Sequence, residues 1–359
     1  MALGIGIVGL PNVGKSTLFN ALTKSNVLAA NYPFATIDPN IGIVAVPDIR
    51  LNRLSAIYKT DKIVPATVKF VDIAGLVAGA SKGEGLGNQF LGHIRSTSAI
   101  IEVVRVFQDG QVTHVNGIAD PASDIGTITT ELILADLTTV TKRLTTLEKE
   151  ARANPKLASL AELTNRAKTI LDANQPLNTN LDQEELAQIS DLQLLTAKPV
   201  IFAFNVDEQD LSDKDKQRQL QTLVAPSKTV FLNAKLESEL TSLDDEDAAE
   251  LRLTYGLEHS GLESMIMAAY DSLGLQSFLT AGDKEVRAWT ITKGSTAPQA
   301  AGAIHGDFER GFIAAEIVDY NDLVDLGSIA ACKAAGKVRT EGKTYIMQPN
   351  DVVEFRFNV

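Results

Sequence analysis

The sequence predicts an α/β fold built on a doubly wound sheet, and three observations support this prediction. Several short β-branched runs are almost continuously apolar, which is typical of strands in a sheet that is covered on both faces. Helical patterns separate several of these runs, as in Lys15–Lys24, which follows the first of them. The pattern G-x-x-x-x-G-K-[ST] stands between that strand and that helix, at Gly9–Ser16.

Composition bounds the class of protein. Of the 359 residues, 45% are hydrophobic and 22% are charged, a globular balance that excludes wholesale disorder. A net charge of -12 means that any contact with RNA would need a local basic patch. The single cysteine, Cys332, excludes an intramolecular disulfide and a thiolate metal cluster. Because we find neither a signal peptide nor a bilayer-spanning run, we expect a cytoplasmic protein without membrane contact.

Six runs are expected to form the main sheet. In chain order they are Gly4–Val8, Ile41–Val46, Thr67–Asp72, Ile100–Val106, Val200–Asn205 and Thr229–Leu232. Strand signals are missing between residues 124 and 195, where apolar residues alternate four and three apart, as in a coiled coil. This seam consists of Ile133, Leu137, Val140, Leu144, Leu147 and Ala151. A second helical run follows Pro155, so we expect an inserted antiparallel helical hairpin. The alternative is a pair of ordinary helices packed on the sheet.

The character of the chain changes again near Gly274. Four strand-like runs follow at Phe278–Leu279, Val286–Ile291, Phe312–Val318 and Val352–Phe357. Helical stretches at 297–304 and 323–335 lie between them, which indicates a small α+β domain. The expected domains are a nucleotide-binding domain at 1–123 and 197–275, the helical hairpin at 124–196, and the C-terminal domain at 276–359.

The loop Gly9–Ser16 is predicted to bind the phosphates of a nucleotide. Its glycines let successive backbone N–H groups point at phosphate oxygens, and the helix N-terminus adds partial positive charge. Lys15 would supply a cation to the outer phosphates, where it acts in catalysis, and the Ser16 hydroxyl would bind Mg²⁺. The nucleotide-binding residues expected here are Asn12, Val13, Gly14, Lys15, Ser16 and Thr17.

A second motif, D-x-x-G, begins at Asp72 and ends at Gly75. In a P-loop enzyme such an aspartate holds the Mg²⁺ shell and the glycine amide meets the γ-phosphate, so Gly75 is a candidate catalytic residue. Six glycines in 75–92 predict a loop that orders on binding a triphosphate, although a flexible surface loop is the plainer interpretation. Thr36, which lies between the two motifs, is a third candidate Mg²⁺ ligand.

The motif that would recognise the base departs from the GTPase pattern N-K-x-D. This chain has Asn205, Val206 and, at the last position, Glu208. The aspartate that accepts two hydrogen bonds from guanine is absent, so the guanine preference is expected to be lost and adenine to be accepted. Backbone contact to the base is expected from the segment after the last strand, which consists of Asn233, Ala234 and Lys235.

Two further expectations concern hydrolysis. Leu76 follows the D-x-x-G motif, where Ras-like enzymes place a glutamine that orients water, and leucine cannot do this. His114 is one candidate for that task, although a lone histidine in such a stretch is more often a surface-loop residue. Asn12 would either help to hold a K⁺ ion beside the phosphates or stabilise the loop through backbone hydrogen bonds.

Taken together, these motifs resemble those of the Obg-like ATPases of the YchF type, and the resemblance covers the whole chain. It implies a C-terminal TGS domain of β-grasp type and a Mg²⁺-dependent ATPase that binds ribosomes and acts in translation or stress responses. It also implies that Leu76 replaces the catalytic glutamine and that His114 takes part in hydrolysis. The alternative is a GTPase-type regulator, or a nucleotide-binding module whose hydrolysis is incidental.

Overall fold

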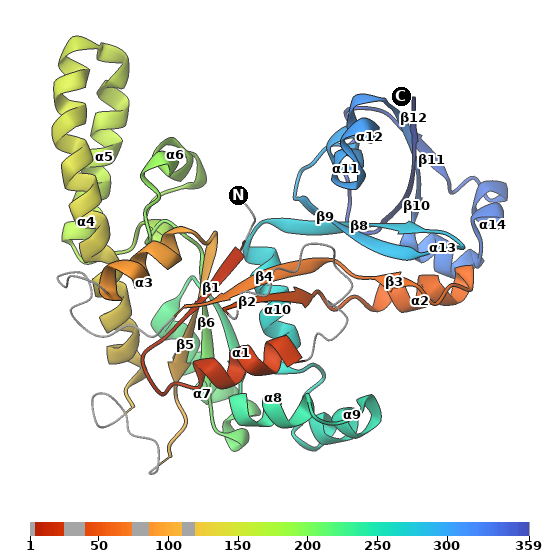
Figure 1. The fold of residues 1–359 in the computed structure, drawn as a ribbon, viewed down its shortest axis with the longest axis horizontal. Coiled ribbons are helices and arrows are strands. Elements are labelled where there is room, and N and C mark those ends of the chain that lie inside the picture. Colours follow the sequence, from red (N-terminus) through yellow and green to blue (C-terminus); the bar gives the residue numbers. More distant parts are fainter. Residues whose placement is uncertain (1–3, 25–39, 74–85, 110–118, 359) are drawn as a thin grey trace. The chain divides into compact units, whose positions relative to one another are not determined.

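The computed structural model describes residues 4–24, 40–73, 86–109 and 119–358 and separates into two compact units (Figure 1). One unit comprises Met1–Val44 and Lys69–Ser272, and the other Ala45–Val68 and Leu273–Val359. This grouping differs from the expected boundaries, which assigned residues 45–68 to the nucleotide-binding domain. The physical reason is that strand β3 (Ile63–Val64) pairs in parallel with β9 (Val286–Thr292).

The first unit contains a sheet with strand order β2-β4-β1-β5-β6-β7. Strand β1 is parallel to β4 and β5, and the parallel pairing continues through β6 to β7. The bounds are β1 Gly4–Val8, β2 Ile41–Ala45, β4 Thr67–Asp72, β5 Ala99–Arg105, β6 Val200–Asn205 and β7 Lys228–Leu232. All six expected strands are present, and the α/β prediction is confirmed. Parallel pairing brings the carboxyl ends of β4, β1, β5, β6 and β7 to one edge, where ligands bind in such sheets.

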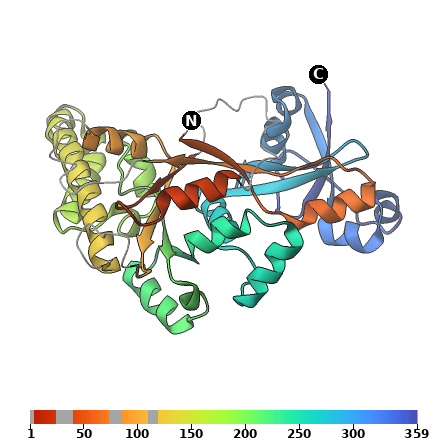
Figure 2. The ribbon, with the colours of Figure 1, turned by 60° about the horizontal axis from the view of Figure 1, so that its bottom comes forward.

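Helices connect the parallel strands and cover the sheet. Those outside the hairpin are α1 Lys15–Lys24, α3 Leu86–Arg95, α7 Lys214–Val224, α8 Ala234–Leu240, α9 Asp245–Thr254 and α10 Gly261–Ser272. Helix α10 packs on β5, β6 and β7, while α1 packs on β1 and on α8. Figure 1 and Figure 2 both show the red α1 beside the teal α8. The start of α1, which follows the P-loop, therefore lies close to the start of α8.

The predicted helical hairpin is confirmed by α4 (Pro121–Ala153) and α5 (Ala158–Asp172), which lie side by side in Figure 1. The Asp120 side chain caps α4 by accepting from two backbone N–H groups, and Pro121 occupies the first turn. The chain turns between the two helices at Asn154 and the short 3₁₀ helix η2 (Pro155–Leu157). Four of the six expected seam residues are buried, namely Ile133, Val140, Leu144 and Leu147.

A buried carboxylate fastens the base of this hairpin to the chain that returns to the sheet. The returning chain contains η3 Leu177–Thr179, α6 Gln183–Gln188 and η4 Ser190–Leu192. Asp136 of α4 has no exposed surface, and it accepts hydrogen bonds from Leu195 N (2.9 Å) and from Thr196 N (2.8 Å) and Oγ1 (2.7 Å). Three donors on one buried side chain fix the position where α4 meets the entry to β6.

The second unit is built around a mixed sheet of order β11-β10-β12-β8-β9-β3. Its strands are β3 Ile63–Val64, β8 Leu275–Ala281, β9 Val286–Thr292, β10 Phe312–Asp319, β11 Arg339–Glu341 and β12 Asp351–Phe357. β8 and β9 form an antiparallel hairpin, and β12 runs parallel to β8 between it and β10. The alanines of helix α11 (Ala297–Ile304) pack against sheet residues that include Phe278 of β8 and Ile317 of β10. This arrangement agrees with the expected β-grasp domain.

The remaining helices of the second unit are α2 Ile49–Tyr58, α12 Gly306–Arg310, α13 Tyr320–Leu326 and α14 Ile329–Ala334. The helical stretch expected at 323–335 is present, but it is divided into α13, which begins at Tyr320, and α14. Gly327 adopts a left-handed conformation with φ +73°, which ends α13, and the Ser328 side chain caps α14. Across the parts of the chain that the structure describes, we find no helix with the length and apolarity needed to cross a bilayer.

Candidate nucleotide-binding site

The P-loop has a backbone shape that requires its glycines. Gly14 has φ +92°, and a Cβ atom there would lie 2.4 Å from Asn205 Nδ2. A Cβ on Gly9 would lie 2.8 Å from the carbonyl oxygen of Val103. Asn12 also adopts a left-handed conformation, with φ 64°. The loop therefore curls tightly against β5 and β6, as a phosphate-binding loop must.

Asn205, the first residue of the predicted base motif, joins the P-loop to the loop that follows β7. It ends β6 and is 4% exposed. Its Nδ2 donates to the carbonyl oxygen of Val13 (2.9 Å), and its Oδ1 accepts from the backbone N–H of Ala234 (3.0 Å). Two segments expected to contact the phosphates and the base are thus held together by one carboxamide.

Asn233 fixes the same region from the other side. Its Nδ2 donates to the carbonyl oxygen of Val206 (2.7 Å), and its Oδ1 caps α8 by accepting from Leu236 N (2.9 Å). Val206 is 1% exposed, and its side chain packs in an apolar cluster with Phe204. The expected contact of Val206 with the nucleotide can therefore come only from its backbone.

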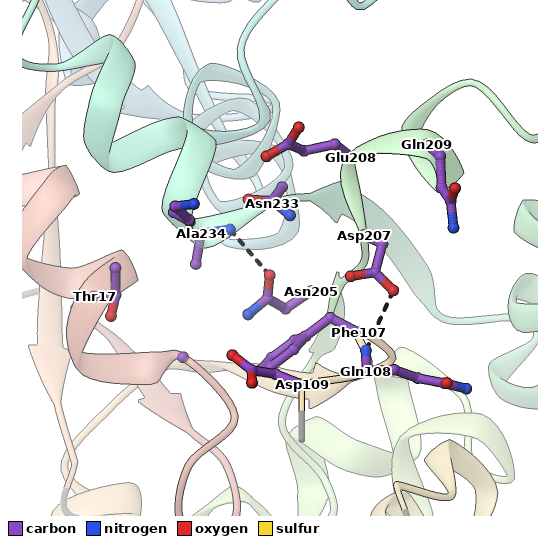
Figure 3. A pocket seen from close by; sticks show the side chains of 12 residues that line it. Thr17, Phe107, Gln108, Asp109, Asn205, Asp207, Glu208, Gln209, Asn233 and Ala234 are labelled. Atoms are coloured by element: carbon purple, nitrogen blue, oxygen red, sulfur yellow. Dashed lines mark hydrogen bonds between the residues drawn. The ribbon is translucent and has the colours of Figure 1, made fainter. Parts of the chain in front are cut away.

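These contacts surround a cavity of about 530 Å³, the size of a small-molecule site. It is lined by Gly14, Thr17, Phe107, Gln108, Asp109, Asn205, Asp207, Glu208, Gln209, Asn233, Ala234 and Lys235 (Figure 3). Seven of these twelve residues are predicted nucleotide-binding residues, so the structure brings the P-loop, the base motif and the α8 loop to one cavity.

Sequence reasoning missed the wall formed by Phe107, Gln108 and Asp109. Arg105 holds this segment, because its guanidinium lies 4.4 Å from the Phe107 ring centroid and donates to the carbonyl oxygens of Phe107 and Asp109, both at 3.3 Å. Gln108 N–H also donates to Asp207 Oδ2 at 3.2 Å (Figure 3). Their position in the chain could have indicated this role, because they directly follow the carboxyl end of β5, where ligands bind in parallel sheets.

Charged groups meet at the phosphate end of the site. Lys15 is buried, and its Nζ donates to Asp72 Oδ1. Asp72 ends β4 and is paired with Ile7 of β1, immediately before the P-loop. The exposed Ser16 hydroxyl and the Asp72 carboxylate are hard oxygen donors, so the residues present fit a divalent cation such as Mg²⁺.

Known proteins resemble this chain along its full length. It is 48% identical over 366 residues to the "Ribosome-binding ATPase YchF" of Bacillus subtilis (strain 168), with 100% of both chains covered. The protein of the same name from Haemophilus influenzae is 48% identical, again over 100% of both chains. The chain belongs to the YchF family.

Domain models and a solved structure agree with membership of the YchF family. Residues 4–134 match a model described as "50S ribosome-binding GTPase", and residues 275–358 match YchF-GTPase_C, described as a protein of unknown function. The "Structure of the Schizosaccharomyces pombe YchF GTPase" is 41% identical, with a TM-score of 0.88 over 99% of this chain and 97% of that one. The names of these relatives therefore differ on the nucleotide, since some say ATPase and others GTPase.

Several expected site residues lie outside the described residues of this YchF-family chain. They are Thr36, Gly75, Leu76 and His114. The third Mg²⁺ ligand, the switch loop and the histidine that acts on water therefore stay predictions. Lys15, Ser16 and Asp72 are described and lie at the carboxyl ends of β1 and β4. A P-loop NTPase family of this kind also implies a divalent metal bound with the nucleotide.

Proposed function

We propose that this protein is a ribosome-associated ATPase that depends on Mg²⁺ and hydrolyses ATP to ADP and phosphate. Hydrolysis would serve as a conformational switch in translation or in a stress response. The names of its full-length relatives support this proposal, as does the replacement of the guanine-reading aspartate by Glu208 in the nucleotide cavity. The proposed partner is the ribosome, either the large subunit or the whole particle, with contacts to rRNA through local basic patches.

The chain's own residues supply binding and positioning for this reaction. Backbone N–H groups of Asn12–Thr17 and the N-terminus of α1 would hold the phosphates, and Lys15 would place its cation on the outer ones. Ser16 and Asp72, with Thr36, would hold Mg²⁺, which neutralises phosphate charge when bound. Asn205 would keep the P-loop and the base wall in register through its two hydrogen bonds.

The preference for adenine depends on the base motif, Asn205–Glu208, at the wall of the cavity. Guanine carries two adjacent donors, N1–H and the 2-amino group, which an aspartate meets with both oxygens. Adenine has neither of these donors, because its N1 is an acceptor and its C2 carries no amino group, and its one donor group is the 6-amino group at C6. With Glu208 at the last motif position and Val206 in place of lysine, we expect ATP to bind more tightly than GTP.

Two proposals concern the attack of water. His114 would orient the water that Leu76 cannot, so His114→Ala is expected to lower turnover with little change in ATP affinity. Asn12, in its left-handed conformation, would help a K⁺ ion supply positive charge beside the phosphates. In that case hydrolysis runs faster in potassium than in sodium at matched ionic strength, and Asn12→Ala removes the difference.

The alternative is a GTPase-type regulator or a nucleotide-binding module with incidental hydrolysis. This alternative is favoured by the names of the solved relative and of the N-terminal family model, which both say GTPase. Competition between ATP and GTP for the purified protein, followed by single-turnover hydrolysis of each, decides between the two. A tenfold or greater preference for GTP would favour the alternative, and binding without hydrolysis in the presence of ribosomes would favour the module.

A further inference from the structure

A tyrosine that lies outside every predicted motif contacts the base motif. The Tyr255 hydroxyl donates to Glu208 Oε2 at 2.9 Å. Glu208 begins the short 3₁₀ helix η5 (Glu208–Leu211) after β6 and lines the nucleotide cavity. Tyr255 comes 47 residues later, directly after α9, and is not among the lining residues. Tyr255 therefore contacts a lining residue of the cavity without lining the cavity itself.

The position of the Tyr255 hydroxyl is fixed by its surroundings. The ring packs against the apolar cluster that contains Phe204 and Val206, which belong to the strand and motif that end at Glu208. The Tyr255 backbone N–H donates to the carbonyl oxygen of Arg252 and ends α9, and Gly256 follows with φ +69°. The hydrogen bond to Glu208 raises the pKa of Tyr255 above its ordinary value of 10.0, so the hydroxyl stays a donor at neutral pH.

This contact changes what the Glu208 carboxylate can recognise. An ionised carboxylate is an acceptor with two oxygens, and guanine is read most tightly when both accept from its N1–H and 2-amino groups. With Oε2 engaged by Tyr255, the side chain is held in one orientation, and Oε1 is the oxygen that this tyrosine does not engage. A carboxylate held in this orientation can still accept from the 6-amino group of adenine, but it cannot turn so that its two oxygens face the N1–H and 2-amino groups of guanine together, which leaves a guanine donor poorly paired.

We propose that Tyr255 is a positioning residue for nucleotide selectivity, which holds the Glu208 carboxylate so that it accepts from adenine and cannot pair with guanine through both oxygens. The inference rests on the proposed function, because it presumes that the cavity binds the base of ATP. It goes beyond that function by assigning part of the preference for ATP over GTP to a residue that does not line the cavity. Its consequence is that the ATP-to-GTP ratio depends on one hydroxyl that touches neither nucleotide.

Tyr255→Phe removes this hydroxyl and keeps the ring that packs on the cluster. We expect the ratio of GTP Kd to ATP Kd to fall by about tenfold, mainly through tighter GTP binding, because the freed carboxylate can then turn to guanine. The rate of ATP hydrolysis at saturation should change little, since the phosphate end of the site is untouched. Equilibrium binding of fluorescent ATP and GTP analogues, with unlabelled competitors, measures the ratio.

The chain offers a matched control in its second unit. The Tyr345 hydroxyl donates to Asp351 Oδ2 at 3.0 Å, so Tyr345→Phe removes the same kind of tyrosine–carboxylate bond in a unit that contributes no lining residue to the cavity. This variant should keep the unmodified ratio. A further test combines Tyr255→Phe with Glu208→Gln, where the loss of the hydroxyl should no longer change selectivity because the carboxylate is absent.

The possible outcomes separate the inference from the function on which it rests. A GTP preference in the unmodified protein overturns the proposed ATPase. An ATP preference that Tyr255→Phe leaves unchanged overturns the role of Tyr255 alone. Equal weakening of ATP and GTP by Tyr255→Phe also overturns it, because that result assigns the hydroxyl to the stability of the wall. A ratio that shifts toward GTP only while Glu208 is present supports the inference.

Discussion

The two central strands of the first unit, β5 and β6, each contribute to two different sites. At their carboxyl ends they lead into the nucleotide cavity, where Asp207 and Glu208 are half-buried in its wall. In their middle, residues such as Glu102 and Phe202 line a second cavity of about 370 Å³, whose other walls come from α4 and from the chain that returns to β6. Glu102 is 3% exposed, and its Oε1 has no hydrogen-bond partner among the described residues.

The difference shows how position along a strand decides what a carboxyl group does. Burial raises the pKa of Glu102 well above its ordinary value, and the nearby Asp124 raises it further. Glu102 is therefore held toward its neutral form, at a cost to stability once it ionises. The carboxyl groups at the strand ends keep contact with water and line the nucleotide cavity, where they can accept hydrogen bonds from a ligand.

The largest effect is expected at the strand ends. Lys15→Ala should weaken ATP binding by about a hundredfold or more, because it removes the cation that faces the outer phosphates. Isothermal titration with ATP and Mg²⁺ measures the change. Lys24→Ala, at the exposed end of the same helix, is the control and should bind normally. Normal binding by Lys15→Ala would mean that the carboxyl ends of the strands are not the nucleotide site.

A second effect, on stability instead of binding, is expected from the buried Asp136 carboxylate, which accepts three hydrogen bonds. Asp136→Ala removes the acceptor of three hydrogen bonds and should lower the free energy of unfolding by about 3 kcal/mol, because Leu195 and Thr196 are left with buried, unpaired N–H groups. Urea unfolding followed by circular dichroism measures it. Asp120→Ala is the comparison on the same helix and should cost about 1 kcal/mol, as the loss of an N-cap does. An equal loss of unfolding free energy in Asp136→Ala and Asp120→Ala would show that burial of the acceptor makes no difference to its contribution.

The smallest effect is expected at Glu102, the buried carboxyl group that lacks a full set of donors. Because its pKa is raised in the folded protein, the folded state binds the proton more tightly than the unfolded chain does. The stability it contributes is present below the ordinary value of 4.5 and is lost as the pH rises through the folded pKa. Glu102→Gln cannot ionise, so its stability should fall less with rising pH, with a gain of about 1 kcal/mol over the unmodified protein near pH 8.

Thermal unfolding of the two proteins between about pH 5.5 and about pH 8 measures this difference. The comparison has to be made between matched proteins, since burial also raises the pKa of Asp136 and Glu237 and gives the whole unit a slope of the same sign. Parallel pH profiles for Glu102→Gln and the unmodified chain would show that Glu102 titrates normally in the folded state.

Much of the fold was predictable because its signals are local. Strand bounds followed from short apolar runs, the hairpin from the seam of α4, and the P-loop from glycines whose spacing matches a backbone that only glycine adopts at Gly14. The helical stretch expected at 323–335 did not include the break at Gly327, whose left-handed conformation ends α13. Residues 45–68 belong to the second compact unit, a grouping that involves β3, whose two residues are too few to show a period in the sequence.

The sequence by itself determined the phosphate-binding loop, the parallel sheet and the family, since each depends on residues that are close in the chain or on a motif with fixed spacing. Only the tertiary structure decided that Asn205 bridges Val13 and Ala234, and that Tyr255 holds Glu208. These pairs are far apart in sequence, and no periodic pattern records them. They meet because the parallel strands end at one edge and the helices that follow are packed against the same apolar core.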